Sequence, residues 1–238
     1  MDDIFGYKIS DSIYSQMKII ETPRFIFRPF NISDAEDVYE YLSQEIVVKY
    51  LPFNAHKDIN SSKKFIQSYF INNYKKGKIG NYAVYYKKDN RVIGNVGFNN
   101  VNPKSKEGEL GICINPKYWG NDFSTELALV AIISSFEFSK VDKLVGLIYE
   151  ENKYSTSCVE KLNFTLIKTY KPNKVLPVCH RYELNRDEYS NMKKTFLPNF
   201  INNLYKSKSE ESEKIKKTVR KIKVKREGKI NYNMKFDN

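Results

Sequence analysis

The sequence of 238 residues has few of the side chains that build disulfide frameworks or metal centres. Its three cysteines, Cys113, Cys158 and Cys179, are odd in number and far apart, and none stands at a spacing typical of metal ligands. We therefore expect free thiols in a reducing compartment and no metal site. A buried cysteine behaves as a small apolar side chain, so catalysis by any of the three is not the favoured interpretation.

Long hydrophobic runs are also missing. The longest apolar block, residues 127–133, is flanked by Glu126 and Glu137 and is much shorter than the roughly 20 residues that cross a bilayer. The chain opens with Met-Asp-Asp and has no apolar segment or small-residue cleavage site near its start, which argues against a secretory signal. These absences predict a cytoplasmic protein.

The positive charge is concentrated at one end of the chain. The net charge is +12, but residues 190–238 hold 14 basic and 5 acidic side chains, whereas residues 1–189 hold 26 and 23. The length allows one sizeable core with an appendage. We predict a lead-in over residues 1–20 that packs loosely or adds a short helix, one domain over residues 21–189, and a basic C-terminal extension over residues 190–238, partly helical or mobile.

The hydrophobic periodicity alternates between the strand and helix periods along the central domain. A capping box, Ser33 to Glu36, is expected to start the first helix, whose apolar side includes Val38, Tyr41 and Leu42. Further helices are predicted over residues 61–75, 124–139 and 155–162. Strands are predicted over residues 24–30, 82–86, 91–99, 107–115, 143–149, 164–170 and 175–184. The order βααβββαβαββ indicates an α/β fold in which a mixed sheet has helices on both faces.

The stretch from Glu109 to Glu126 is the most informative part of the sequence. It reads as a buried strand, a loop punctuated by Pro116 and Gly120, and the start of a helix that is too apolar for the surface. The N-terminus of a helix carries unpaired N–H groups and the positive end of the helix dipole, so the junction suits an anion such as a pyrophosphate. The carboxylate of Asp122, in the middle of the loop, argues against this interpretation.

Three motifs together resemble a known family. They are Thr-Pro-Arg-Phe-Ile-Phe-Arg at 22–28, Tyr-Trp-Gly-Asn-Asp-Phe-Ser-Thr-Glu at 118–126, and Glu-Asn-Lys-Tyr-Ser-Thr-Ser-Cys-Val-Glu-Lys-Leu-Asn-Phe at 151–164. In this order around one strand-helix-strand unit, they are similar to those of the GNAT-fold N-acetyltransferases of the ribosomal-protein, RimJ/RimL-like branch. The resemblance covers roughly residues 20–189. It implies transfer of an acetyl group from acetyl-CoA, used as co-substrate, to an amine.

The resemblance also implies a cofactor site. The backbone of Ile112, Cys113 and Ile114 would carry the pantetheine arm between two splayed strands, and the N–H of Cys113 or Ile114 would bind the developing oxyanion. Trp119 would pack at the base of the loop or touch the cofactor, and Asn152 would face the pantetheine arm. The pyrophosphate would lie against the loop residues Gly120, Asn121, Asp122, Phe123, Ser124 and Thr125.

The resemblance assigns two catalytic roles. An ammonium group must lose a proton before it attacks, and Glu109 is the candidate base; the alternative is a solvated edge-strand glutamate. Many members of the family carry an acidic Tyr where this chain has Val159. Ser155 is therefore the candidate that stabilises or protonates the thiolate, and its alternative role is an ordinary helix N-cap.

Three residues depart from the family pattern. In the loop, Asp122 stands where the family usually has Gly, and Ser124 stands where it commonly has Gly or Ala. Asn163 replaces the Gly at the end of the third motif, a mild change because Asn tolerates the left-handed conformation. If Asp122 blocks the phosphates, the alternative is a GNAT-fold binding or regulatory module that has lost CoA binding. Such a module would use its basic tail to contact RNA, the ribosome or an acidic partner.

The acceptor amine is not readable from the sequence, and protein α-amines and small amines both remain open. Glu36, Asp37 and Glu40 could contribute an acidic pocket for a small polyamine, but a solvated helix face is the alternative. His180 and Tyr182 alternate onto one face of the last predicted strand, where a substrate could lie, or where they simply pack.

Overall fold

The computed structural model describes residues 2–206. A single ten-stranded sheet runs through it in the order β1-β2-β3-β4-β5-β6-β7-β8-β10-β9. All strand pairs are antiparallel except β7 with β8, which are parallel. The strands are β1 Asp2–Ile4, β2 Tyr7–Asp11, β3 Lys18–Glu21, β4 Phe25–Arg28, β5 Asn81–Tyr86, β6 Arg91–Asn102, β7 Glu107–Ile114, β8 Lys143–Tyr149, β9 Thr165–Tyr170 and β10 Cys179–Asn185.

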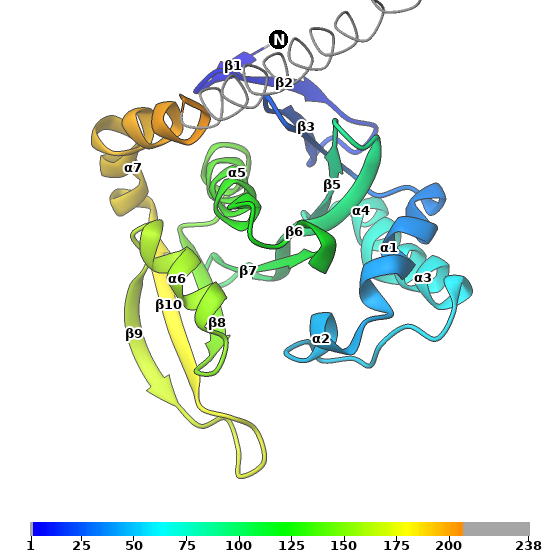
Figure 1. Ribbon diagram of the computed structural model, residues 1–238. Helices are drawn as coiled ribbons and strands as arrows, with labels where there is room; N and C mark the ends of the chain where they lie inside the picture. The colour runs from blue at the N-terminus through cyan, green and yellow to red at the C-terminus, as the bar shows by residue number, and fades with distance from the viewer. Residues whose placement is uncertain (1, 207–238) are drawn as a thin grey trace, which may run out of the picture. The chain divides into compact units, whose positions relative to one another are not determined.

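Helices cover both faces of the central strands, as predicted. Figure 1 shows α1 to α4 on one side of β6 and β7 and α5 with α6 on the other. The helical segments are η1 Ile32–Asp34, α1 Ala35–Leu42, α2 Glu45–Val48, α3 Ile59–Phe65, η2 Ile66–Ile71, α4 Asn72–Lys75, η3 Pro116–Tyr118, α5 Phe123–Phe138, α6 Lys153–Lys161 and α7 Arg186–Thr195. The predicted mixed α/β fold and its core element order are confirmed.

The α5 helix is buried on nearly every side. Its apolar run from Leu127 to Ile133 has no exposed member, which confirms the reading of this block as an internal helix rather than a surface one. Because β7, α5 and β8 follow one another and the two strands are parallel, they form the strand-helix-strand crossover that the sequence predicted.

The N-terminal lead-in differs from the prediction. Residues 2–21 form β1, β2 and β3, which extend the sheet beyond β4, rather than a loose segment or a short helix. The side chains of Tyr7, Ile9, Met17 and Ile20 are each at most 4% exposed and belong to the core. Each of these strands is only three to five residues long, which gives too few positions for an alternation of buried and polar residues to predict a strand.

The first helices also begin and continue differently from the prediction. The capping box consists of Asn31, the N-cap of the 3₁₀ turn η1, and Asp34, the third residue of that turn, and not of Ser33 and Glu36. Val38, Tyr41 and Leu42 are buried in α1, as expected. The single helix predicted over residues 61–75 is present as α3 and α4 with a π-helical turn, η2, between them. Hydrophobic spacing does not distinguish these hydrogen-bond registers.

The C-terminal residues belong to a second compact unit that starts at Asn191. Within it, residues 197–206 are helical, in agreement with the helix predicted to begin near Pro198. The Lys-rich run at 214–229 and the remainder of the basic tail, residues 207–238, lie outside the described residues. The predicted contacts of this tail with RNA, the ribosome or an acidic protein therefore stay predictions.

Candidate active site

The parallel strands β7 and β8 are paired over only part of their lengths. Residues 107–109 of β7 align with residues 143–145 of β8, and the register ends there. Beyond this point β7 remains paired with β6 as far as Ile114, and β8 remains paired with β10 as far as Tyr149. The two strands therefore diverge after Glu109 and leave a split in the sheet, as the resemblance predicted.

The backbone of β7 presents alternate residues to this split. The Asn115 N–H donates to the Ile93 carbonyl on β6 at 2.8 Å. Since successive residues of a strand direct their N–H and C=O groups to opposite edges, Cys113 also faces β6, whereas Ile112 and Ile114 face the split. Of the two N–H groups considered for the oxyanion, that of Ile114 therefore faces the split and that of Cys113 does not. The Ile114 carbonyl oxygen on the same side accepts from the Trp119 indole Nε1 at 2.9 Å.

The loop between η3 and α5 brings a helix N-terminus to the same region. Gly120 has φ of +77° and a Cβ there would meet no atom within 4 Å, so its backbone is open to a ligand. Asp122 holds the N-cap position with φ of 54°, in the left-handed region, and is exposed. The Asp122 side chain makes no capping hydrogen bond, so it does not compete with an anion for the N–H groups of the first turn of α5.

A buried ion pair anchors the start of α5. The Glu126 side chain is fully buried and accepts from Arg24 Nε at 2.7 Å, from Arg24 Nη2, and from the Thr22 hydroxyl at 3.0 Å. The Arg24 guanidinium also lies 4.7 Å from the centre of the Phe123 ring. In the sequence, Arg24 stands out only as part of the motif at 22–28, and its pairing with Glu126 was not predicted. The signal was a glutamate at the edge of an apolar helix, because a buried carboxylate requires a cation.

The N-terminus of α6 lies at the end of β8, beside the open end of the split. Asn152 is the N-cap, and its side-chain oxygen accepts from the Ser155 N–H at 3.3 Å. Ser155 is therefore not the N-cap, which removes its alternative structural role. Within residues 2–206 the Ser155 hydroxyl has no hydrogen-bond partner, and it lies in the first turn, where the helix dipole favours negative charge.

The candidate base lies at the point where the strands part. Glu109 is the last residue of β7 in register with β8, it is half-buried, and it makes no ion pair within the described chain. Burial is the largest cause that raises the pKa of Tyr69, Tyr170 and Cys179, and the charge of Glu109 adds to the rise in each of them. The charge of Glu109 therefore acts on groups of η2, β9 and β10.

Two of the three acidic side chains of α1, Asp37 and Glu40, are already engaged, whereas Glu36 is exposed. Asp37 binds Arg91 at 2.7 Å, and Glu40 binds Arg91, Lys117 at 2.6 Å and the Asn115 amide at 3.1 Å. Burial opposes ionisation of Glu40, but the hydrogen bonds from Lys117, Asn115 and Arg91 lower its pKa to about 2. Asp37 and Glu40 are therefore not available for the acidic polyamine pocket that was considered as an alternative to a solvated helix face.

The other reactive side chains are shielded. Cys113, Cys158 and Cys179 are free and buried, as predicted, and burial raises the pKa of Cys113 to about 12 and of Cys158 to about 11. The two residues singled out on β10 do share a face, with ring centres 6.3 Å apart, but each has a partner. His180 bonds to Thr169 at 2.9 Å, and Tyr182 donates to Glu160 at 3.1 Å.

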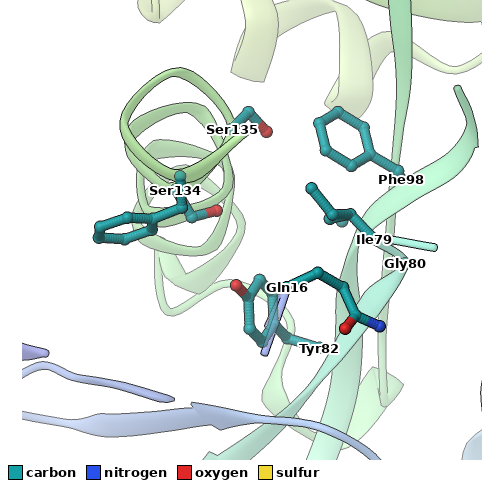
Figure 2. A pocket seen from close by; sticks show the side chains of 9 residues that line it. Gln16, Ile79, Gly80, Tyr82, Phe98, Ser134 and Ser135 are labelled. Carbon is teal, nitrogen blue, oxygen red and sulfur yellow. The ribbon is translucent and has the colours of Figure 1, made fainter. Parts of the chain in front are cut away.

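A small internal gap lies elsewhere in the domain. Gln16, Gly80, Tyr82 and Phe98 surround it together with Ser134 near the far end of α5 (Figure 2), and its volume of about 10 Å³ matches a single water site. It is too small and too distant along α5 to take part in the site. Among residues 2–206 no group of three or more His, Cys, Asp or Glu side chains could hold a metal ion. No helix in that same range is long and apolar enough to cross a membrane.

Comparison with known proteins gives a consistent result. The model of the acetyltransferase (GNAT) domain family matches residues 24–165. An uncharacterized N-acetyltransferase of Bacillus licheniformis, p20, is 25% identical over 179 residues, which cover 73% of this chain and 99% of that protein.

Solved structures share the fold. The microcin C7 self-immunity acetyltransferase MccE, in complex with acetyl-CoA and AMP, has a TM-score of 0.60 and 21% identity, covering 69% of this chain and 93% of its own. RimL, a ribosomal L7/L12 α-N-protein acetyltransferase in complex with coenzyme A, has a TM-score of 0.63 and 16% identity, covering 71% and 99%. The family match spans more than half of the sequence and coincides with the split sheet described above, so this chain belongs to the GNAT acetyltransferase family and is an acetyltransferase enzyme.

Proposed function

We propose that this enzyme transfers an acetyl group from acetyl-CoA directly to a primary amine while both substrates are bound. The observation that carries the proposal is the divergence of β7 from β8 after Glu109. It leaves strand backbone without a neighbour beside the N-terminus of α5, a combination suited to an extended ligand that ends in an anion.

The residues of the split and the loop fit such a donor. Ile112 and Ile114 offer backbone groups along one edge, with Cys113 packed between them, and Asn152 lies across the opening with its amide nitrogen available as a donor. At the loop, a Cβ at Gly120 would meet no atom within 4 Å, and the Asp122 side chain makes no capping hydrogen bond to α5. The phosphate contacts are proposed to come from this loop: Trp119, Gly120, Asn121, Asp122, Phe123, Ser124 and Thr125.

The proposed chemistry follows from the side chains around the split. Bound acetyl-CoA would supply the acyl group as a thioester. Glu109 takes a proton from the attacking amine, directly or through water, while the Ile114 N–H donates to the carbonyl oxygen. As the carbon–nitrogen bond forms and the carbon–sulfur bond breaks, Ser155 donates to the departing thiolate at the positive end of α6.

The geometry of Asp122 favours an enzyme over a binding module that has lost CoA. That alternative required Asp122 to cap α5 or repel the phosphates, and its side chain is exposed and makes no cap. Its left-handed φ of 54° is the conformation for which Gly is best suited, which accounts for the residue that the family usually carries here.

The acceptor is proposed to be a protein α-amine or a small primary amine. RimL acts on a protein α-amine according to its description, and another structure of this fold belongs to a spermidine N-acetyltransferase, SpeG, from Vibrio cholerae. The engagement of Asp37 and Glu40 by Arg91 and Lys117 disfavours a polyamine bound against α1.

The proposal is tested by thermal unfolding with and without acetyl-CoA, followed by mass spectrometry of candidate peptides and amines. Binding to the native state raises the melting temperature, and products heavier by one acetyl group identify the acceptor. Asp122→Gly should bind acetyl-CoA at least as tightly as the natural chain, because it removes a carboxylate near the phosphates. No thermal shift and no calorimetric heat at millimolar acetyl-CoA, for either protein, would overturn the proposal.

A further inference from the structure

The strand beside β7 contains a β-bulge level with Glu109. Phe98 is in register with Leu110 and Asn100 with Glu109, so Asn99 is left without a partner in β7. A bulge of this kind sets two residues of one strand against a single position of the other and redirects their side chains. Here the extra residue falls beside the last residue of β7 that pairs with β8.

Both asparagines of the bulge lie on the face of the sheet that carries Glu109. A Cβ on Gly111 would stand 2.4 Å from Nδ2 and from Oδ1 of Asn99, so this amide lies directly over Gly111, two residues along from Glu109 and on the same face. Asn100 faces Glu109 across the strand pair and so shares its face. In the described part of the chain neither amide has a hydrogen-bond partner, and both residues are exposed.

A tyrosine from the helical side completes the cluster. Tyr69 belongs to the π-helical turn η2, its ring is stacked on Phe65 with centres 5.0 Å apart, and its hydroxyl donates to the Asn99 carbonyl at 3.4 Å. Burial and then the charge of Glu109 raise the pKa of Tyr69, which keeps the phenol protonated beside the carboxylate. Single π-helical turns are frequent at functional sites.

The neighbouring carboxylates on this face are neutralised, unlike Glu109. Arg181 lies 3.0 Å from Glu107 and 2.6 Å from Glu183, and Lys143 lies 2.8 Å from Glu183. A cation that approaches the split from this side therefore meets Glu109 as the carboxylate without an ion-pair partner in residues 2–206.

We propose that Glu109, Asn99, Asn100 and Tyr69 form the subsite that holds the acceptor as a primary ammonium group. The inference rests on the proposed acetyl transfer and specifies where its second substrate binds. An ammonium nitrogen has three N–H donors, and the cluster offers a carboxylate, two amide oxygens and a phenol oxygen as acceptors. Transfer of one proton from the ammonium nitrogen to Glu109 breaks an N–H bond, forms an O–H bond and leaves the amine lone pair for attack.

The test uses the full-length protein and three probes that share a benzyl group. Benzylammonium has charge and N–H donors, benzyltrimethylammonium has charge alone, and benzyl alcohol has no charge. Nuclear magnetic resonance follows the side-chain amide signals of Asn99 and Asn100 in each titration. We expect benzylammonium alone to shift them saturably. Equal responses to benzylammonium and benzyltrimethylammonium, or no saturable shift with benzylammonium, would overturn the subsite.

Variants give a second readout. Asn99→Ala and Tyr69→Phe should each weaken benzylammonium binding about threefold to tenfold, the effect of losing one hydrogen bond. The controls are Asn60→Ala, at an exposed residue of α3, and Tyr39→Phe, at a half-buried residue of α1 whose hydroxyl donates to the Lys57 carbonyl, and both should leave it unchanged. Calorimetry with acetyl-CoA on the same proteins separates the two proposals. Intact acetyl-CoA binding with an amine response that the variants do not alter rejects the subsite alone, whereas absent acetyl-CoA binding rejects the donor site.

Discussion

Two glutamates of one strand show how the sheet changes character along its length. Glu107 and Glu109 lie on the same face of β7, two residues apart. Glu107 stands in the paired part of the β7–β8 ladder and is held by Arg181 at 3.0 Å and Lys143 at 3.7 Å. Glu109 stands where the ladder ends, and it has no cation partner among the described residues.

The comparison distinguishes carboxylates that stabilise the fold through ion pairs from the carboxylate of Glu109, which is proposed to take part in the reaction. In the paired region, Glu107 is held by Arg181 and Lys143, and at the start of α5 Glu126 is likewise held by Arg24. At the split, the polar groups of Glu109, Asn99 and Ser155 are left without such partners. Their hydrogen-bonding groups are therefore available to a ligand that enters the split.

The largest expected effect lies on the structural side of this comparison. Arg24→Met leaves Glu126 buried without its cation and should lower the free energy of unfolding by about 3–5 kcal/mol. Urea unfolding measures the loss. The double variant Arg24→Met with Glu126→Gln should recover a large part of it, because the uncompensated charge is removed. A loss below about 1 kcal/mol would mean that the pair behaves like a surface ion pair.

Glu109→Gln should affect the reaction and not the fold. With its base removed, kcat for amine acetylation should fall about 10²-fold or more, while the melting temperature and acetyl-CoA binding change little. Glu107→Gln is the matched control, since it loses ion pairs on the same face and should lower stability slightly without affecting kcat. Equal losses of kcat in both variants would remove the distinction between the two glutamates.

The smallest predicted effect concerns Glu40 and depends on pH. Its pKa is lowered from 4.5 to about 2 in the folded protein, so its contribution to stability is present above about pH 4.5 and is lost as the pH falls toward 2. Glu40→Gln should therefore destabilise by about 1–2 kcal/mol at pH 7, less than the full shift implies because the side chain is partly exposed. The two unfolding curves should converge near pH 2, and a constant gap down to that pH would contradict the assignment.

Much of the fold was predictable because its strongest patterns are local. The strand at residues 143–149 was predicted to the residue, and α5 was recognised from apolar composition alone. Asn163 has the left-handed φ of 60° expected where the family carries Gly. By contrast, β1 to β3 were missed, since short strands with few inward apolar residues have little periodicity to detect.

The arrangement of the polar side chains in the site was harder to predict from the sequence. Motifs singled out Glu109, Asn152 and Ser155, but which group caps α6 depends on geometry that the spacing leaves open. Asn99 was not predicted to belong to the site, and the sequence pattern places Tyr69 only on the apolar side of the helix predicted over residues 61–75. A β-bulge and a π-helical turn each shift a side chain by one residue, and hydrophobic spacing averages over such shifts. The relation of Asn99 and Tyr69 to Glu109 arises only when β6, η2 and β7 are assembled.

The short β7–β8 ladder also connects two parts of the sheet. Three aligned residue pairs join the strands from β1 to β7 to the strands β8, β10 and β9, and the chain passes from one part to the other through α5. A connection of three pairs resists twisting less than the eight aligned pairs between β6 and β7. The ladder ends at Glu109, so a widening of the split beyond that residue breaks no pairing between β7 and β8.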